Sequence, residues 1–380
     1  MYIHSVRHPI HILKPEAAPS VGAVVKGRGT PWAIEHRFTS QAHESYDDGW
    51  GTLDQAASEE HLPPTTEIVE ERVKSILSSN DSPDIPFDVS VNPYRGCEHG
   101  CVYCFARPTH SYLNLSPGLD FETRITAKVN AAERLREAFS RRGYKPSHLS
   151  LGAATDAYQP VERRLRITRG VVEVLAECRH PFSLVTKSSG VERDLDLLVP
   201  MAQQRLCSVY VSVTSLDPAL ARILEPRAAA PHRRLRTIET LARAGVPVGV
   251  SLSPVIPFIN EPEIERIVEA AAEAGATAAF AVVLRLPWEV NPLFQNWLNE
   301  HFADRAARVM ARVREMNGGR DYKADFSSRL RGSGVWADLL HQRVAKAIQR
   351  HGLNRERIAL DLTLFQPPNA KGNSDQGNLF

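Results

Sequence analysis

The sequence feature that most constrains the fold is a regular alternation of short apolar runs and longer helical patterns from Phe87 onward. The short runs are rich in β-branched residues and bounded by polar or turn residues, as buried parallel strands are. Between them, apolar residues recur at the three- and four-residue spacing of helices that pack one face against a sheet. Six expected strands result: Asp88–Asn92, His148–Gly152, Phe182–Thr186, Ser208–Val213, Val246–Leu252 and Thr277–Leu284.

Six strand–helix units predict an α/β fold built on a parallel sheet. Right-handed crossovers fit either an open doubly wound sheet or an incomplete, laterally open barrel, and periodicity alone does not choose between them. The expected helices cover residues 129–139, 171–175, 195–201, 235–241 and 264–271, and a longer helical pattern over residues 293–313 follows the last strand.

The units divide the chain into four parts. Residues 1–86 are rich in Pro, charged and polar residues around one short amphipathic stretch, and predict an extension with little core of its own. Residues 87–331 hold the (βα)6 domain. In residues 332–365 an amphipathic helix predicts a cap over the open side. Residues 366–380, rich in Pro, Asn and Gly, predict a flexible tail.

Composition and charge exclude several classes of protein. Hydrophobic residues make up 43% and charged residues 24% of the chain, which is typical of soluble folded proteins. The formal net charge of +2 gives no overall basic field, and no apolar run approaches the roughly 18 residues that span a membrane. Neither a secretory signal nor an even disulfide framework is evident, so we expect a cytoplasmic protein with no membrane partner.

Three of the five cysteines follow the first expected strand directly. Cys97, Cys101 and Cys104 have C-x3-C-x2-C spacing, and Gly96 and Gly100 free the backbone to wrap closely around an inorganic group. Loops after the strands of βα folds collect the reactive groups. An iron–sulfur cluster with four irons normally takes four thiolate ligands. Three cysteines therefore predict a cluster in which one iron is left open for another ligand.

The cysteine loop, with the aromatic Tyr103 just before its last cysteine, resembles that of the radical S-adenosylmethionine (SAM) superfamily. The segment from Thr155 to Glu162, Thr-Asp-Ala-Tyr-Gln-Pro-Val-Glu, resembles an uncharacterised subgroup of the spore photoproduct lyase-like branch, also called SplB-like or "DNA repair photolyase". The resemblance covers residues 88 to about 331 and implies an incomplete (βα)6 TIM-type barrel with an N-terminal extension and a C-terminal helical cap.

One departure from that branch bears on activity. Spore photoproduct lyases carry a cysteine shortly after the second strand that returns a hydrogen atom to the repaired thymine, and Leu151 to Glu162 contains none. The sequence therefore argues against thymine-dimer repair. The remaining cysteines, Cys178 and Cys207, fall at the opposite end of the expected units and are expected to be buried structural residues.

The resemblance implies a 4Fe-4S cluster on Cys97, Cys101 and Cys104, with SAM chelating the fourth iron. An electron from a donor such as flavodoxin or ferredoxin would then split SAM into methionine and a 5′-deoxyadenosyl radical, which abstracts a hydrogen atom from the substrate. The alternative is a non-catalytic adaptor that holds zinc in a closed Cys3His site, with His99 or His110 as the fourth ligand.

Other residues at the strand ends are expected to bind SAM. In the resemblance, Tyr103 lies near the adenine, while Thr155 and Asp156 take the place of the segment that holds the SAM amino group. The same pair also suits a helix N-cap, and both interpretations stay open. From their chemistry and position, three further residues are candidates for the SAM carboxylate and ribose: Lys187, Ser212 and Arg227.

Two substrate classes remain open. Nucleic acid is favoured by the resemblance and by two groups of arginines, although charge runs are also common on solvated helix faces. Radical modification of a protein or small molecule is the alternative. The arginines are Arg163, Arg164, Arg166 and Arg169 in the first group and Arg233, Arg234 and Arg236 in the second.

The C-terminus predicts a protein partner. Gln376-Gly-Asn-Leu-Phe380 resembles the peptide by which bacterial repair and replication proteins dock on the sliding clamp. Gly377 stands where a leucine is usual in that peptide. We therefore expect the sliding clamp among the partners of this chain.

Overall fold

A seven-stranded sheet lies at the centre of the computed structural model, which describes residues 28–30, 34, 36–38, 65–356 and 358–368. Its strand order is β10-β9-β8-β7-β6-β3-β2, parallel throughout except for the antiparallel β2 at one edge. All six expected strands are confirmed. They are β3 (Val89–Val91), β6 (Leu149–Leu151), β7 (Phe182–Thr186), β8 (Cys207–Ser212), β9 (Val248–Val255) and β10 (Ala278–Val283). The seventh strand, β2 (Leu77–Ser79), was not among the expected ones.

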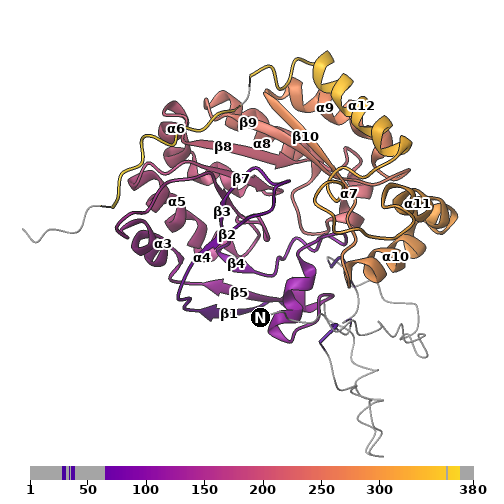
Figure 1. Ribbon diagram of the computed structural model, residues 1–380, viewed down its shortest axis with the longest axis horizontal. Coiled ribbons are helices and arrows are strands. Elements are labelled where there is room, and N and C mark those ends of the chain that lie inside the picture. Colours follow the sequence, from indigo (N-terminus) through magenta and orange to yellow (C-terminus); the bar gives the residue numbers. More distant parts are fainter. Residues whose placement is uncertain (1–27, 31–33, 35, 39–64, 357, 369–380) are drawn as a thin grey trace, which may run out of the picture.

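Helices cover the outer face of this curved sheet (Figure 1). The edge strands β10 and β2 do not pair with each other, so the barrel stays incomplete and the expected α/β, TIM-type fold is confirmed. The main helices are α3 (Ala131–Phe139), α5 (Ile167–Glu177), α6 (Leu195–Gln203), α7 (Pro218–Leu224), α8 (Pro231–Arg243), α9 (Ile264–Glu273), α10 (Val290–His301), α11 (Ala303–Met316) and α12 (Val335–Arg350).

Shorter helices lie in the connections near the ends of the strands. They are the α-helices α2 (Asp120–Thr123) and α4 (Glu162–Leu165) and the 3-10 helices η1 (Arg107–Leu113), η2 (Ser189–Asp194) and η3 (Glu261–Glu263). The long helical pattern over residues 293–313 is split between α10 and α11. Phe302, between them, has φ −145° and ψ 47°, which lies outside the helical region.

A second, three-stranded sheet was not expected from the sequence. It joins β1 (Glu67–Glu71), β5 (Arg124–Lys128) and β4 (Tyr94–Arg95), with β1 parallel and β4 antiparallel to β5. Between β1 and β2, Val73 and Ile76 are buried in the main core. Residues 67–79, which the sequence analysis placed in the extension, therefore belong to the two sheets, while the domain limits at 86, 331 and 365 remain predictions.

The C-terminal part covers one edge of the barrel and then returns to its base. Helix α12 packs on α9 and β10, and the Asn354 side chain bonds both the N–H and the carbonyl of Ala279 at the edge strand, which satisfies backbone groups that a bare edge exposes. Farther on, Gln366 N donates to the carbonyl of Cys178, below the start of β7. The expected clamp peptide, Gln376–Phe380, lies outside the described residues.

No helix in residues 65–356 or the other described ranges is long and apolar enough to cross a membrane.

Candidate functional site

The three clustered cysteines lie in the loop between β4 and η1, at the carboxyl ends of the parallel strands. Gly96 and Gly100 adopt φ of 77° and 69° in this loop, a region that only glycine visits without strain. Cys97 and Cys101 are buried and Cys104 is partly exposed, and all three thiols are free. The loop therefore presents three sulfur donors at the open end of the barrel, as the sequence predicts.

The thiols are close enough to influence one another's ionisation. Burial raises the pKa of Cys97 well above its usual value, and the negative charges of Asp156, Cys101 and Cys104 raise it further. Burial likewise raises the pKa of Cys101 to about 12, although the Lys187 ammonium opposes the shift. Thiolates at such positions need a strongly positive centre beside them, which is what a metal cluster provides. The donor set fits the 4Fe-4S group that the sequence predicts.

The histidines of the zinc alternative already face other groups. His99 Nδ1 lies 3.3 Å from the Asp156 carboxylate, and His110 Nε2 lies 3.1 Å from the carbonyl of Arg124. Among the described residues, no three Cys, His, Asp or Glu side chains are gathered closely enough to hold a single metal ion. A four-iron cluster is wider than one ion, so its thiolates stand farther apart than the ligands of a zinc site.

A buried glutamine holds the cysteine loop from behind. Gln159 Oε1 accepts a hydrogen bond from Glu98 N at 2.9 Å, and its Nε2 donates to the carbonyl of Gly96 at 3.1 Å. The side chain is completely buried, so both bonds are shielded from water. The motif that contains Gln159 was recognised in the sequence, but no role was assigned to this residue, because it lies 61 positions from Glu98 and their contact is not evident in the sequence.

Asp156 connects three elements of the site. Its Oδ1 accepts from Thr186 Oγ1 at 2.8 Å and from Tyr158 N at 2.9 Å, and its Oδ2 accepts from Lys187 N at 2.7 Å. His99 holds the pKa of this carboxyl near 2 against the opposing effect of burial. Asp156 thus ties the loop after β6 to β7 and to the cysteine loop, and it does not cap α4, whose N-cap residue is Val161.

Thr155 and Ser212 are buried more deeply than their expected roles suggest. The Thr155 hydroxyl donates to the carbonyl of Tyr94 at 3.1 Å. Ser212, at the end of β8, is 2% exposed, and its carbonyl accepts from Arg234 at 3.1 Å. Both residues lie at the strand ends where SAM binding is expected, and their contact with SAM remains a prediction.

A buried charged network lies next to the cysteine loop. The Tyr103 hydroxyl donates to Glu225, which also pairs with Arg234 and accepts from Thr214. Burial alone would raise the pKa of the Glu225 carboxyl, but Arg234 and Lys187 hold it below its usual value. Glu225 is therefore an anion in the interior, and sequence reasoning missed it by attending to its neighbour Arg227.

Lys187 is the cation of this network that faces the site. Its Nζ lies 5.9 Å from the centroid of the Tyr103 ring. Burial disfavours the charged form, yet the nearby Cys101 and Glu225 raise the pKa of Lys187 above its usual value. Among the described residues its ammonium makes no hydrogen bond or ion pair within contact distance, so it is free to meet an anionic group.

Arg227 is engaged with the cysteine loop. Its Nη2 lies 3.1 Å from Glu98 Oε1, its Nη1 donates to Thr66 Oγ1 at 3.3 Å, and its backbone N–H donates to the carbonyl of His99. The expected pairing with the SAM carboxylate would compete with Glu98. Its pairing with the SAM carboxylate remains a prediction.

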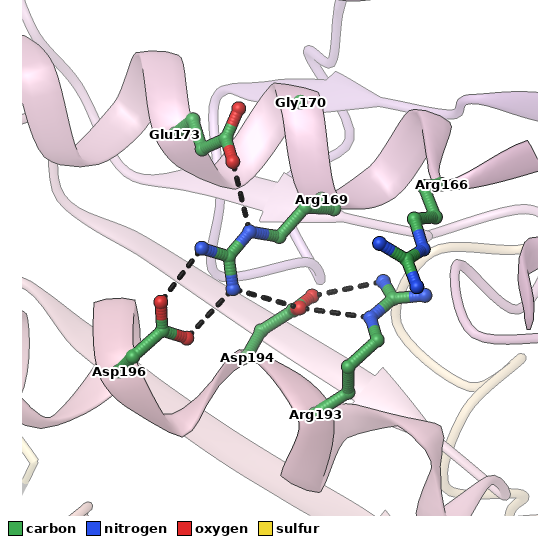
Figure 2. Close-up of a pocket in the computed structure, with 7 residues that line it drawn as sticks. All are labelled: Arg166, Arg169, Gly170, Glu173, Arg193, Asp194 and Asp196. Carbon is green, nitrogen blue, oxygen red and sulfur yellow. Dashed lines mark hydrogen bonds and ion pairs between the residues drawn. The ribbon is translucent and has the colours of Figure 1, made fainter.

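The arginines that favoured nucleic acid differ in availability. Figure 2 shows Arg169 bonded to Glu173, Asp194 and Asp196, and Arg193 bonded to Asp194. The guanidinium group of Arg166, in the same pocket, makes no hydrogen bond or ion pair with any described residue. The same holds for the exposed guanidinium groups of Arg163 and Arg164 on the adjoining turn of α4.

The second arginine group is largely internal. Arg234 is 1% exposed and pairs with Glu225, and Arg233 pairs with Glu192 at 2.6 Å. Only Arg236 of this group is exposed with a guanidinium group that has no partner among the described residues. Phosphate binding is therefore better supported at the first group than at the second.

A partial α/β barrel with three free thiols beyond its first strand defines the class of protein, and comparison with known proteins identifies the family. The family model for the radical SAM superfamily matches residues 91–271. An uncharacterised protein of Mycobacterium tuberculosis is 34% identical over 271 residues, which are 71% of this chain and 76% of that protein. An uncharacterised protein of Methanocaldococcus jannaschii is 23% identical over 197 residues, 52% of this chain and 71% of that protein. The chain belongs to the radical SAM superfamily and is a radical SAM enzyme.

Solved structures share the fold. Spore photoproduct lyase complexed with dinucleoside spore photoproduct matches with a TM-score of 0.51 and 14% identity, over 75% of this chain and 80% of that chain. A mutant of the same lyase with bound AdoMet and dinucleoside spore photoproduct matches with a TM-score of 0.50 over the same shares. The partial barrel of this chain is thus similar in fold to that of spore photoproduct lyase.

Proposed function

We propose that the chain binds a 4Fe-4S cluster through Cys97, Cys101 and Cys104, binds SAM at the remaining iron, and uses the 5′-deoxyadenosyl radical to abstract a hydrogen atom from nucleic acid. The observation that carries the proposal is the group of three free thiols in one loop at the strand ends of a radical SAM barrel. Three protein thiolates leave one iron of such a cluster for another ligand.

The bound cluster would supply one electron to the SAM sulfonium, and cleavage of SAM would then give methionine and the 5′-deoxyadenosyl radical. The chain's own part is to bind and orient. Lys187 offers an unpaired ammonium for the SAM carboxylate, and the Tyr103 ring beside it offers a face for the adenine. Thr155, Ser212 and Arg227 would line the same site, while Asp156 would keep the backbone of Lys187 in place.

Exposed aromatic and cationic side chains near the cysteine loop support nucleic acid as the substrate class. Phe105, directly after Cys104, is 47% exposed, and the Arg285 guanidinium lies 5.2 Å from its ring centroid. Tyr112 and Trp288 are 70% and 57% exposed on either side of Arg37, whose guanidinium lies 5.3 Å and 4.5 Å from their rings. Aromatic faces interleaved with guanidinium groups bind unstacked bases, and unpaired arginines such as Arg166 bind phosphates.

Cofactor chemistry is tested by SAM turnover in protein reconstituted without oxygen. The wild-type chain should hold close to four irons and four sulfides and release 5′-deoxyadenosine when reduced, whereas Cys101→Ala should do neither. The zinc-adaptor hypothesis predicts the opposite for the wild-type chain: stoichiometric zinc, no optical absorption from an iron–sulfur cluster and no 5′-deoxyadenosine. Either result is read from metal analysis and chromatography of the products.

Nucleic-acid binding is tested with a fluorescent single-stranded oligonucleotide at two salt concentrations. Trp288→Ala should weaken binding by about 1 kcal/mol or more, the scale of one lost base–aromatic stack. Arg166→Gln should weaken it at low salt and flatten its salt dependence, because one phosphate contact is lost. Leu339→Ala on α12, an exposed apolar residue away from the site, is the control. Absence of binding at low salt would favour a protein or small-molecule substrate instead.

The partners and the cytoplasmic location belong to the same proposal. A reduced flavodoxin or ferredoxin would supply the electron, and free thiols of this kind suit a reducing compartment. The terminal Gln376–Phe380 would dock on the sliding clamp. Full-length protein and protein lacking these five residues should differ in clamp binding, and equal binding would remove the clamp from the list of partners.

A further inference from the structure

The described residues of the N-terminal segment, 28–30, 34 and 36–38, make side-chain or backbone contacts with the cysteine loop, with the residues that follow it, or with the start of α10. The segment was expected to be an extension with little core. Instead, it has an inner attachment at Gly29 and an outer attachment at Arg37.

The inner attachment centres on one buried carboxylate. Gly29 N donates to Glu122 Oε2 at 2.9 Å, and the Thr30 hydroxyl donates to Glu122 Oε1 at 3.3 Å. Arg28 Nη1 donates to the backbone carbonyl of Glu122 at 2.8 Å. Glu122 has no exposed surface, so the N-terminal segment supplies bonds that water does not replace.

Arg107 connects Glu122 to the backbone of the cysteine loop. The two side chains form an ion pair with an N–O distance of 2.5 Å, and both are fully buried. Arg107 in turn donates to the carbonyl of Cys101 at 2.9 Å and to that of Gly100 at 3.2 Å. A continuous line of bonds therefore runs from Gly29 to the backbone of a candidate cluster ligand.

Close backbone packing reinforces this line. A Cβ added at Gly29 would overlap the carbonyl oxygen of Gly100, and a Cβ added at Gly100 would lie 2.7 Å from Glu122 Oε2. Both positions therefore require glycine. The N-terminal segment lies directly against the cysteine loop rather than over it at a distance.

The outer attachment fixes the segment beside the mouth of the barrel. Ile34 N donates to the Ser116 hydroxyl at 2.7 Å, and that hydroxyl donates back to the carbonyl of Ile34 at 2.8 Å. Arg37 pairs with Glu289 at 3.0 Å and is flanked by aromatic rings. Two separated attachments hold a segment under constraint more effectively than one.

We propose that the described residues 28–30, 34 and 36–38 form a strap that positions the cysteine loop, with Gly29 and Thr30 acting through Glu122 and Arg107. The strap fixes a loop whose glycines would otherwise leave it mobile, and so sets how tightly the three thiols are held. The proposal extends the proposed function. It also concerns the thiols of the chain itself, so one of its tests does not require SAM cleavage.

The test compares Gly29→Ala with Gly170→Ala in the full-length chain. An added Cβ at Gly170, on α5, meets only an ordinary contact 3.5 Å from Ala132, so this variant is a matched control. In chelator-treated protein, alkylation of Cys97 and Cys101 should be at least about fivefold faster in Gly29→Ala than in wild type, because the loop opens more often. The buried Cys207 reports on global unfolding and should react as slowly as before.

The reconstituted protein gives a second readout. Gly29→Ala should lose iron to a chelator faster and show an altered electron paramagnetic resonance spectrum of the reduced cluster, while Gly170→Ala should match wild type. If Gly29→Ala also exposes Cys207, the milder Thr30→Ala replaces it, with Thr30→Ser expected to restore wild-type behaviour. Unchanged alkylation and spectra in Gly29→Ala, or in Thr30→Ala, would overturn the strap, whether or not the protein cleaves SAM.

Discussion

The two ends of the barrel are built from different kinds of contact. At the carboxyl ends of the strands, the cofactor end, charged groups are buried in pairs such as Glu225 with Arg234 and Glu122 with Arg107. At the amino ends, the floor, Phe139 stacks on His180 with centroids 4.5 Å apart, and Phe365 packs edge-on against both rings.

The two kinds of contact contribute differently to stability and to the chemistry of the site. Buried ion pairs lose their hydration, and apolar groups of similar volume are often as stabilising. The floor gains from burying aromatic and apolar surface without that loss. We expect that the charges at the cofactor end orient groups there, while the floor supplies more of the stability. Four measurements test this contrast.

The largest expected effect separates cysteines at the two ends. Cys97→Ala should abolish cluster binding and 5′-deoxyadenosine release, because one of three ligands is lost. Cys207→Ala, at the floor, should keep both and lower the free energy of unfolding by about 1 kcal/mol through lost packing. Iron analysis and denaturant titration measure the two effects. Loss of iron from the Cys207 variant would contradict the division between the ends.

The next effect tests the floor as the source of stability. Phe139→Ala removes a fully buried ring and should lower the free energy of unfolding by about 4 kcal/mol. Iron content and product yield per folded molecule should stay at the wild-type level. Phe326→Ala, which truncates an exposed ring, should change stability by less than about 0.5 kcal/mol. Equal losses in the two variants would show that the floor has no special role.

A somewhat smaller effect tests the charged network. Glu225→Gln keeps the volume of the side chain but leaves Arg234 buried without an anion, and should lower the free energy of unfolding by about 3 kcal/mol. Adding Arg234→Met should recover part of that loss, because the unpaired charge is gone. If the double variant is no more stable than the single one, the loss does not come from the buried arginine.

The smallest effect is a pH dependence that arises at the floor. Burial lowers the pKa of His180 to about 4, whereas an unfolded histidine titrates near its usual value of 6.5. Between these values the unfolded chain binds a proton that the folded chain does not, so this residue's contribution to stability falls as the pH falls from 6.5 to 4. The total effect is about 2 kcal/mol after allowance for partial solvation.

His180→Phe isolates that contribution. The variant removes the titrating ring, so its free energy of unfolding should fall less steeply over the same pH range than that of wild type. Its absolute stability is not the readout, because the Tyr144 hydroxyl loses its partner at 2.9 Å. Parallel pH profiles for variant and wild type would assign the acid sensitivity to other groups.

How far the sequence predicts this molecule depends on how local each signal is. The six barrel strands are short runs of mostly buried, mostly apolar residues, and such runs stand out in sequence. Strands β1 and β5 do not stand out, because Glu67–Glu71 and Arg124–Lys128 carry charges on their solvent side. Their pairing joins segments more than 50 residues apart, which periodicity does not reveal.

The site shows the same limit. Cys97, Cys101 and Cys104 are recognisable because their spacing alone carries the signal. Glu122 and Gln159 are not, because each acts on a loop that is distant in sequence, through bonds that only the fold brings together. Arg234 was misjudged for the corresponding reason: an arginine beside two others looks solvent-exposed, but its helix turns it inward onto Glu225.

The return of the C-terminal segment to the floor has a consequence for larger assemblies. The backbone N–H of Gln366 donates to the carbonyl of Cys178, so the last described residues lie at the base of the barrel and the cysteine loop lies at the other end. A tail that begins at the base works as a tether: whatever grips it holds the enzyme from behind and leaves the mouth free to meet its target. Fusion proteins and surface immobilisation are therefore better attached at the C-terminal side, because the described residues 28–30 on the N-terminal side lie against the cysteine loop.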